Sequence, residues 1–157
     1  MIKLTRIDDR LVHGQVAFTW TPSLDVDCLL IANDKVVKDE FQKMTLNLAK
    51  PSRVKLLIKS VNDAATFLND ERSAPLKILV LVNNVKDAAV LAAQVPEITS
   101  INLGGLRSKD GSKLISKAFA VNEDDLMIIR DLLEKGIELE VRQVPTDNKK
   151  YVKELIY

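Results

Sequence analysis

The only histidine of the chain, His13, lies in the segment TRIDDRLVHGQV, residues 5–16. A neutral imidazole is nucleophilic near pH 7, so this side chain can accept a phosphoryl group. Gly14 follows at the expected start of a helix, where free backbone N–H groups favour an anion and no side chain blocks its approach. Arg10 and Arg6 add positive charge and paired donors that match phosphate oxygens. This composition suits a site that takes a phosphoryl group on His13.

Two aspartates precede the histidine at short distances along the chain. Asp8 and Asp9 can orient the arginines, or can accept a hydrogen bond from one imidazole nitrogen and leave the other nitrogen free as the nucleophile. The alternative is that the histidine is a hydrogen-bonded structural residue among surface ion pairs, which is common for a lone histidine near charged residues. On residue types alone, both interpretations stay open.

Other kinds of catalytic site lack their residues in this chain. One histidine and one cysteine, Cys28, do not form a zinc pattern, so no metal is expected. Neither a G-x-S-x-G nucleophile elbow nor a G-x-x-x-x-G-K-[ST] phosphate loop occurs. The segment NLGGL, residues 102–106, lacks the spacing of a dinucleotide-binding loop and predicts a turn at the end of a strand. We therefore expect no cofactor.

Composition indicates one domain over residues 1–157 in a reducing compartment. Lysine and arginine total 23 against 22 acidic residues, a net charge of +1, which argues against general nucleic-acid binding. Cys28 lies in the apolar run CLLIA and has no partner for a disulfide. No signal-peptide core or membrane-spanning segment is present, so we expect a cytoplasmic chain without membrane insertion.

Short apolar runs alternate with longer segments of helical periodicity, as in βαβ units around a parallel sheet. The expected strands are residues 2–7, 28–33, 54–60, 77–83, 100–104 and 138–144. The expected helices are residues 14–20, 34–49, 61–70, 86–94 and 123–135. Within residues 105–121, a KDG turn signal and the alternating LISKAFAV predict a hairpin or an antiparallel edge strand. The fold class is therefore α/β, an open, twisted, mostly parallel sheet with helices on both faces.

The clearest expected helix is residues 34–49, with Asp34 as its N-cap and Pro51 as a stop signal. Its apolar residues recur at helical spacing, with lysine and glutamate elsewhere. These residues are Val37, Phe41, Met44 and Leu48.

Three loops follow expected strands and can share one edge of the sheet. His13 follows the first strand, residues 33–35 follow the second, and residues 104–107 follow the strand at 100. In open α/β sheets, ligands bind beyond the carboxyl ends of the strands, often where the strand order reverses. The first loop is therefore the candidate site.

The segment RIDDRLVHGQV, residues 6–16, resembles the active-site signature of a family of bacterial sugar phosphotransferase proteins. These are the IIB components of the mannose/fructose/sorbose family of the phosphoenolpyruvate-dependent phosphotransferase system (PTS). Further segments resemble the family in the same order, namely residues 31–40, 100–105, 116–121 and 135–147, so nearly the whole chain is covered. The resemblance implies a phosphocarrier with protein-N(π)-phosphohistidine–sugar phosphotransferase activity.

The resemblance also implies roles for single residues. His13 would receive the phosphoryl group, and Arg10 matches the family arginine that contacts it. Arg6 matches a second positive residue of the loop. Asp9 and Gln15 match further motif positions, so that the expected phosphate-binding residues are Arg6, Asp9, Gly14 and Gln15.

In the family, the phosphoryl group comes from a phosphohistidine on IIA and passes to a sugar that the membrane components IIC and IID bring across the membrane. The donor is itself a high-energy N–P compound, so neither ATP nor a metal is needed. Two partners must then dock over His13, and Leu11, Val12 and Leu106 are candidates for an apolar rim. The alternative for each of these three residues is ordinary core packing.

The rival hypothesis is a regulatory module of the same fold that binds a transporter or a phosphate-bearing protein without passing phosphate on. A weaker alternative is a phosphohydrolase that loses the group to water. The sugar is left open among mannose, fructose, sorbose and amino sugars, with a hexose or N-acetylhexosamine ranked first.

Overall fold

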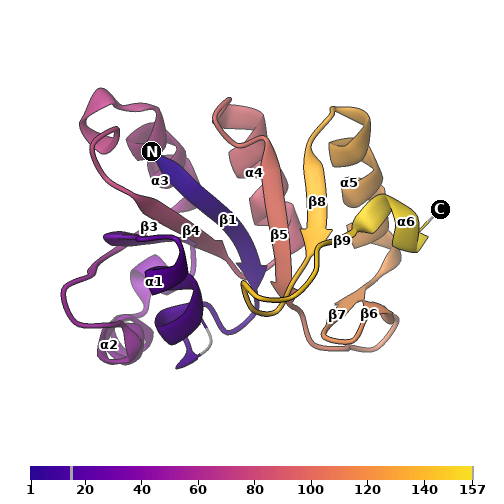
Figure 1. The fold of residues 1–157 in the computed structure, drawn as a ribbon, viewed down its shortest axis with the longest axis horizontal. Coiled ribbons are helices and arrows are strands. Elements are labelled where there is room, and N and C mark those ends of the chain that lie inside the picture. The colour runs from indigo at the N-terminus through magenta and orange to yellow at the C-terminus, as the bar shows by residue number, and fades with distance from the viewer. Residues whose placement is uncertain (15, 157) are drawn as a thin grey trace.

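The computed structural model describes residues 1–14 and 16–156. The strands are β1 (Ile2–Asp8), β2 (Cys28–Ala32), β3 (Lys55–Lys59), β4 (Ile78–Val82), β5 (Ser100–Gly105), β6 (Lys113–Ser116), β7 (Phe119–Val121), β8 (Glu138–Val141) and β9 (Lys150–Tyr151). Within the described residues, seven of them form one sheet in the order β3-β2-β4-β1-β5-β8-β9 (Figure 1). All neighbours are parallel except β8 and β9. The predicted α/β fold with a mostly parallel sheet is confirmed.

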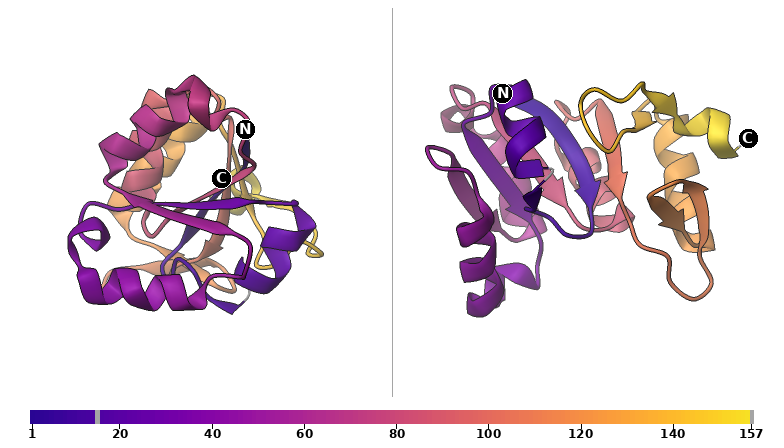
Figure 2. Two further views of the ribbon diagram at one scale, coloured as in Figure 1. Left: turned by 90° about the vertical axis from the view of Figure 1, so that its left-hand side faces the viewer. Right: turned by 60° about the horizontal axis from the view of Figure 1, so that its bottom comes forward.

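Helices cover both faces of the sheet (Figure 2). The helical segments are η1 (Val16–Trp20), α1 (Thr21–Ser23), η2 (Val36–Lys38), α2 (Glu40–Ala49), α3 (Val61–Asn69), η3 (Glu71–Ser73), α4 (Val85–Gln94), α5 (Glu123–Glu134) and α6 (Val152–Ile156). The buried faces of α3, α4 and α5 form one core with the sheet, and η1, η2 and α2 form a second core on the other side. Cys28 lies in the first core, where burial raises the pKa of its thiol to about 11.

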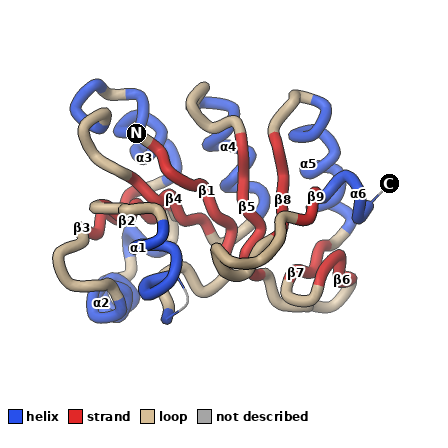
Figure 3. The backbone as a smooth tube through the Cα atoms, in the orientation of Figure 1, coloured by secondary structure: helices blue, strands red, loops and turns tan. Residues whose placement is uncertain are grey.

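The predicted hairpin is present, but the alternating run LISKAFAV is not one strand. β6 and β7 are its two halves, paired antiparallel as a separate small ladder at the lower end of the molecule in Figure 3. Leu106, which follows β5, exchanges backbone hydrogen bonds with Ala118 and Ala120, so the hairpin is tied to the end of β5. The sequence patterns did not predict β9 and α6.

The strand order reverses beside β1. The chain passes from β1 to β2, β3 and β4 on one side of the sheet, and then to β5 and β8 on the other. A ligand site is therefore expected beyond the carboxyl ends of β1 and β5. The loops after these two strands do meet there, since the backbone N–H of Asp9 donates to the carbonyl of Gly105 at 2.9 Å.

The expected helix 34–49 is interrupted, and its apolar stripe faces outward. Asp39 has extended backbone angles and caps α2 by accepting a hydrogen bond from the N–H of Gln42, so the helix restarts there in a new phase. The prediction of Asp34 as the N-cap is wrong, because its carboxylate instead accepts from the N–H of Val61. Leu46 is the α2 residue that is fully buried. The side chains of Phe41, Met44 and Leu48 are 78%, 62% and 83% exposed.

Two leucines of α2 test this orientation as a matched pair. Leu46→Ala removes a buried side chain and should lower the free energy of unfolding by about 2–4 kcal/mol. Leu48→Ala removes an exposed one and should change it by less than about 0.5 kcal/mol. Urea unfolding followed by circular dichroism measures both variants, and equal losses would contradict the orientation of α2.

Candidate functional site

A tight turn carries the chain from β1 to His13. The N–H of Leu11 donates to the carbonyl of Asp8 at 3.0 Å, and Leu11 has a positive φ of 57°. This left-handed conformation is strained for a leucine, but its side chain is 1% exposed and anchors the turn in the second core. Beyond His13 the chain enters a helical segment, in which the N–H of Ala17 donates to the carbonyl of His13 at 2.8 Å. Both sides of the histidine are thereby fixed.

The imidazole of His13 is held by Asp8, the last residue of β1. Its Nε2 lies 2.8 Å from Oδ2 of Asp8, while Oδ1 of Asp8 accepts a hydrogen bond from the N–H of Arg10 at 3.1 Å. An ionised carboxylate only accepts, so Nε2 carries the proton and the neutral ring has its lone pair on Nδ1. The histidine side chain is 13% exposed. The geometry therefore leaves Nδ1 as the nitrogen with a free lone pair.

Asp8 remains ionised although its side chain is buried. Burial opposes ionisation and acts to raise its pKa, but the hydrogen bond from His13 and the charge of Arg6 outweigh burial and hold the pKa of Asp8 below its ordinary value. This stabilisation is present above the ordinary pKa of an aspartate and is lost as the pH falls through the lowered value. Asp8 is thus a permanent acceptor for Nε2 at neutral pH.

Arg6 lies behind Asp8 and is itself 1% exposed. Its Nε and Nη2 donate to Oδ2 of Asp8 at 3.3 and 3.1 Å. The remaining donors go to Oδ1 of Asn102 and to the carbonyls of Arg142 and Gln143, at 2.7, 3.0 and 3.1 Å. All five N–H groups of the guanidinium are therefore used inside the protein. This placement corrects the expectation that Arg6 binds phosphate directly: it positions Asp8.

A buried polar network continues from Arg6 through β5 to β8. The Nδ2 of Asn102 donates to Oε1 of Glu140 at 3.0 Å, and Arg142 donates to both carboxylate oxygens of Glu140 at 2.9 and 3.0 Å. The ring of Trp20 lies 5.3 Å from the guanidinium carbon of Arg6 and 5.0 Å from that of Arg142. Sequence reasoning missed these residues, because nothing in their local pattern links them to the loop at His13.

Gly104 on β5 makes room for the guanidinium of Arg6. A Cβ atom built on Gly104 would overlap the side chain of Arg6, whereas one built on Gly105 would lie 3.6 Å from Oδ1 of Asp8, an ordinary contact. The first glycine of the GG pair is thus needed for close approach. At Gly14 an added Cβ meets nothing within 4 Å, so the space beside this glycine is open.

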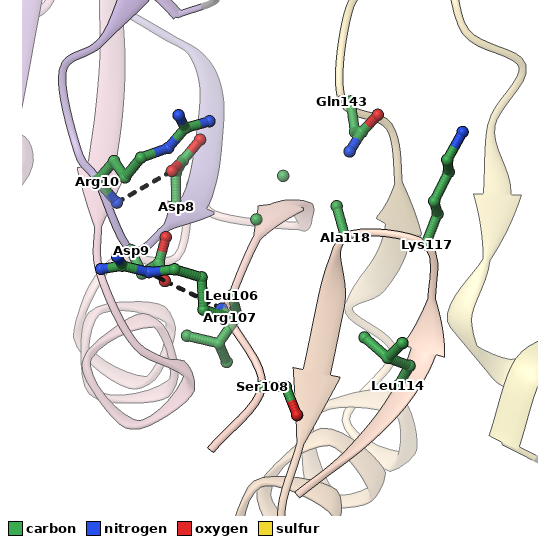
Figure 4. A pocket seen from close by; sticks show the side chains of 12 residues that line it. Asp8, Asp9, Arg10, Leu106, Arg107, Ser108, Leu114, Lys117, Ala118 and Gln143 are labelled. Atoms are coloured by element: carbon green, nitrogen blue, oxygen red, sulfur yellow. Dashed lines mark hydrogen bonds and ion pairs between the residues drawn. The ribbon is translucent and has the colours of Figure 1, made fainter.

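A pocket of about 500 Å³ opens beside Asp8, between the loop after β1 and the β6–β7 hairpin (Figure 4). Arg10 and Asp9 line one side of it, and Lys117 and Gln143 the other. Arg10 is exposed, and its guanidinium has no hydrogen-bond or ion-pair partner within residues 1–14 and 16–156. It is available to an incoming anion.

The other expected site residues fall into three groups. The carboxylate of Asp9 is occupied by Arg107, whose backbone N–H and Nε donate to it at 2.9 and 2.8 Å. This pair joins the loop after β1 to the loop after β5. Leu11, Val12 and Leu106 are 1%, 5% and 7% exposed, so the alternative of core packing holds and they form no exposed rim. Gln15 lies outside the described residues.

Two further observations concern metal ligands and membrane spans. The described residues contain no group of three or more histidine, cysteine, aspartate or glutamate side chains arranged to hold a metal ion. No helix among them has the length and apolar character needed to cross a membrane.

Fold and site together define a small α/β protein in which a histidine anchored by Asp8 follows the central strand at the switch point of a mostly parallel sheet, with Arg10 in the same turn. Residues 2–157 match the family model of the PTS system sorbose subfamily IIB component, and the chain belongs to this family. It is a phosphocarrier of a sugar phosphotransferase system.

Individual relatives agree with this membership. A probable phosphotransferase enzyme IIB component of Streptococcus pyogenes serotype M6 is 37% identical over 99% of both chains. The mannose-specific EIIAB component of Escherichia coli K12 is 35% identical over 99% of this chain, which spans 48% of that relative. The crystal structure of the IIBSor domain of the Klebsiella pneumoniae sorbose permease superposes with a TM-score of 0.93 at 29% identity, covering 99% of this chain and 96% of that one.

The neighbouring glycines of β5 test the network behind His13. Gly104→Ala should displace Arg6, lower the free energy of unfolding by about 1–3 kcal/mol, and loosen the hydrogen bond between Asp8 and Nε2. Histidine ¹⁵N chemical shifts report the tautomer, and urea unfolding reports stability. Gly105→Ala is the control and should leave the tautomer of His13 as in the wild type. An unchanged tautomer in the folded Gly104→Ala variant would show that Arg6 does not hold Asp8.

Proposed function

We propose that His13 accepts a phosphoryl group on Nδ1 from a phosphohistidine of a IIA protein or domain and transfers it to a sugar hydroxyl. The observation that carries this proposal is the 2.8 Å contact between Nε2 of His13 and Oδ2 of Asp8, which leaves Nδ1 as the attacking nitrogen. In the first step the donor N–P bond breaks as the Nδ1–P bond forms. In the second, a sugar oxygen replaces Nδ1 on phosphorus, the imidazole leaves in its neutral form with the proton still on Nε2, and the hydroxyl proton passes to solvent.

Asp8 and Arg10 have different parts in this transfer. As Nδ1 attacks, positive charge develops on the imidazole ring, and the carboxylate of Asp8 stabilises it through Nε2–H. Arg10 provides a guanidinium next to the loop, where it can neutralise the phosphoryl oxygens during in-line displacement. Positioning and charge compensation then supply most of the catalysis. Among the other residues expected to bind phosphate, Gly14 leaves room for the phosphoryl group to approach, and Gln15 is proposed to contact that group.

The docking surface for the partners is proposed to include Phe18 in place of the expected rim. Its side chain is 72% exposed, and it lies on η1, five residues after His13 in the chain. An exposed aromatic side chain so close to the nucleophile is suited to anchor a partner protein.

Family membership supports a proposal for the donor, the acceptor and the location. The E. coli relative is named EIIAB, and this chain matches about half of it, which supports a IIA unit as donor. We propose that the acceptor is a hexose or N-acetylhexosamine delivered by membrane components IIC and IID, and that the chain works at the cytoplasmic side of that transporter. Relatives are named for mannose, sorbose and fructose, so the sugar of this chain is left open.

Phosphorylation of the purified protein tests the proposal. Incubation with phosphoenolpyruvate, the general PTS proteins and a cognate IIA should add the mass of one phosphoryl group, labile in acid and stable in alkali. Nuclear magnetic resonance should place this group on Nδ1, and His13→Ala should stay unmodified. An unmodified wild-type protein, with donor proteins verified as active, would contradict transfer and favour the regulatory binding module.

A kinetic comparison separates charge compensation from docking. Arg10→Ala removes a donor to the transferring group and should lower the maximal transfer rate from IIA by about a hundredfold. Phe18→Ala removes a docking contact and should raise the IIA concentration at half-maximal rate by about tenfold with the maximal rate retained. Rapid-quench measurements over a range of phospho-IIA concentrations give both quantities. Both roles would be refuted if Arg10→Ala changed only the half-saturating concentration of IIA and Phe18→Ala lowered only the maximal rate.

A further inference from the structure

The outward face of α2 has no role in the phosphoryl site. Phe41, Met44 and Leu48 lie on the side of the helix opposite Leu46, and each is more than 60% exposed. Three large apolar side chains on three turns of helix form a continuous stripe. An apolar stripe normally faces the core, so its exposure indicates that something outside the chain covers it.

The chain around this stripe is basic. Residues 34–55 contain six lysines and arginines and three acidic residues, whereas the rest of the chain is slightly acidic. The three acidic groups are already engaged: Asp34 and Asp39 accept backbone hydrogen bonds, and Glu40 pairs with Lys43 at 3.1 Å. The basic residues of the segment are Lys35, Lys38, Lys43, Lys50, Arg53 and Lys55. Among the described residues, no acidic side chain pairs with any of these except Lys43. Lys35 and Lys38 therefore precede the helix that carries the apolar stripe, and Lys50, Arg53 and Lys55 follow it.

We propose that α2 docks on an anionic phospholipid surface. Phe41, Met44 and Leu48 would insert at the boundary between headgroups and acyl chains, and the lysines that precede and follow the helix would lie near the lipid phosphates. Amphipathic helices with large apolar residues and a basic rim bind membranes in this way. A second copy of the chain fits less well, because two positive segments would face each other. Three side chains also offer only a few hundred Å², well below the roughly 800 Å² per partner of a stable protein interface.

The placement of α2 connects this surface to the phosphoryl site. In Figure 1, α2 covers one face of the sheet and lies toward the same lower end of the molecule as the carboxyl ends of β1 and β5. Docking through α2 would therefore hold the His13 edge near the membrane, where the acceptor sugar emerges. This consequence rests on the proposed function, whereas lipid binding itself does not.

Vesicle co-sedimentation tests the proposal on the full chain. The protein should sediment with vesicles that contain phosphatidylglycerol, bind much less to pure phosphatidylcholine vesicles, and be released by high salt. The triple variant Phe41→Gln, Met44→Gln, Leu48→Gln should weaken partitioning by at least about tenfold. Met127→Gln on α5 is the matched control. The side chain of Met127 is 68% exposed, similar to the 62% of Met44, but it follows an acidic first turn of the helix. This variant should bind vesicles as the wild type does.

A second variant separates charge from folding. Lys35→Gln with Lys38→Gln leaves the apolar stripe intact and should also weaken binding to anionic vesicles. Both variants should accept phosphate from soluble phospho-IIA at the wild-type rate, so failure of lipid binding and failure of phosphoryl transfer are measured independently. The proposal is overturned if the wild type does not bind anionic vesicles, or if the folded triple variant binds as well as the wild type. It is equally overturned if the triple variant binds lipid vesicles as the wild type does but no longer binds the membrane components IIC and IID, since a protein then covers α2.

Discussion

One carboxylate oxygen organises the site. Oδ2 of Asp8 is shared between the imidazole of His13 and the guanidinium of Arg6. Asp8 ends the central strand β1, so its place is set by pairing with β4 on one side and β5 on the other. The orientation of the nucleophile therefore depends on the sheet, while the loop that carries the histidine has only to close a turn of a few residues. A mobile loop alone would leave the nucleophilic nitrogen unspecified.

Burying Asp8 and Arg6 is costly unless every charge and donor is compensated. Removing Asp8 would strand a guanidinium that is 1% exposed, and removing Glu140 would leave Arg142 and Asn102 without their carboxylate. The network spans β1, β5 and β8 and contacts Trp20 on the first helix, so distant segments are tied to one geometry. The network is better understood as fixing the relative positions of these segments than as adding to the free energy of unfolding. Apolar residues of similar volume often stabilise a protein as much as a buried ion pair does.

The sequence predicted the local part of this arrangement and missed the non-local part. His13, Asp8 and Arg10 fall within six residues, and a strand followed by a turn brings the imidazole of His13 and the backbone N–H of Arg10 to the carboxylate of Asp8. The burial of the Arg6 side chain depends on the strands beside β1, which a local sequence pattern does not reveal. The sequence therefore predicted a guanidinium that is available to phosphate. The same limit applies to Leu11, whose positive φ turns it into the core, and to α2, where one capping aspartate breaks the helix and reverses its apolar face. Hydrophobic periodicity and composition predict which segments form helices and strands. Tertiary contacts decide which face of each element is buried and how deeply its side chains lie.

A phosphocarrier must also release what it accepts, and the shared carboxylate bears on this. A carboxylate devoted to Nε2–H alone would stabilise the phosphorylated imidazole strongly and slow the outgoing step, because tight binding of an intermediate raises the barrier that follows. Arg6 draws on the same oxygen, with donors at 3.1 and 3.3 Å, and so moderates the stabilisation that Asp8 gives to the ring. Arg6 thereby has a reason to be both charged and buried: an arginine in solvent would bind the phosphoryl group itself, whereas this one adjusts the group that holds the histidine. For the proposed transfer through His13, the balance between accepting and donating the phosphoryl group then depends on Arg6, which shares Oδ2 of Asp8 with the imidazole.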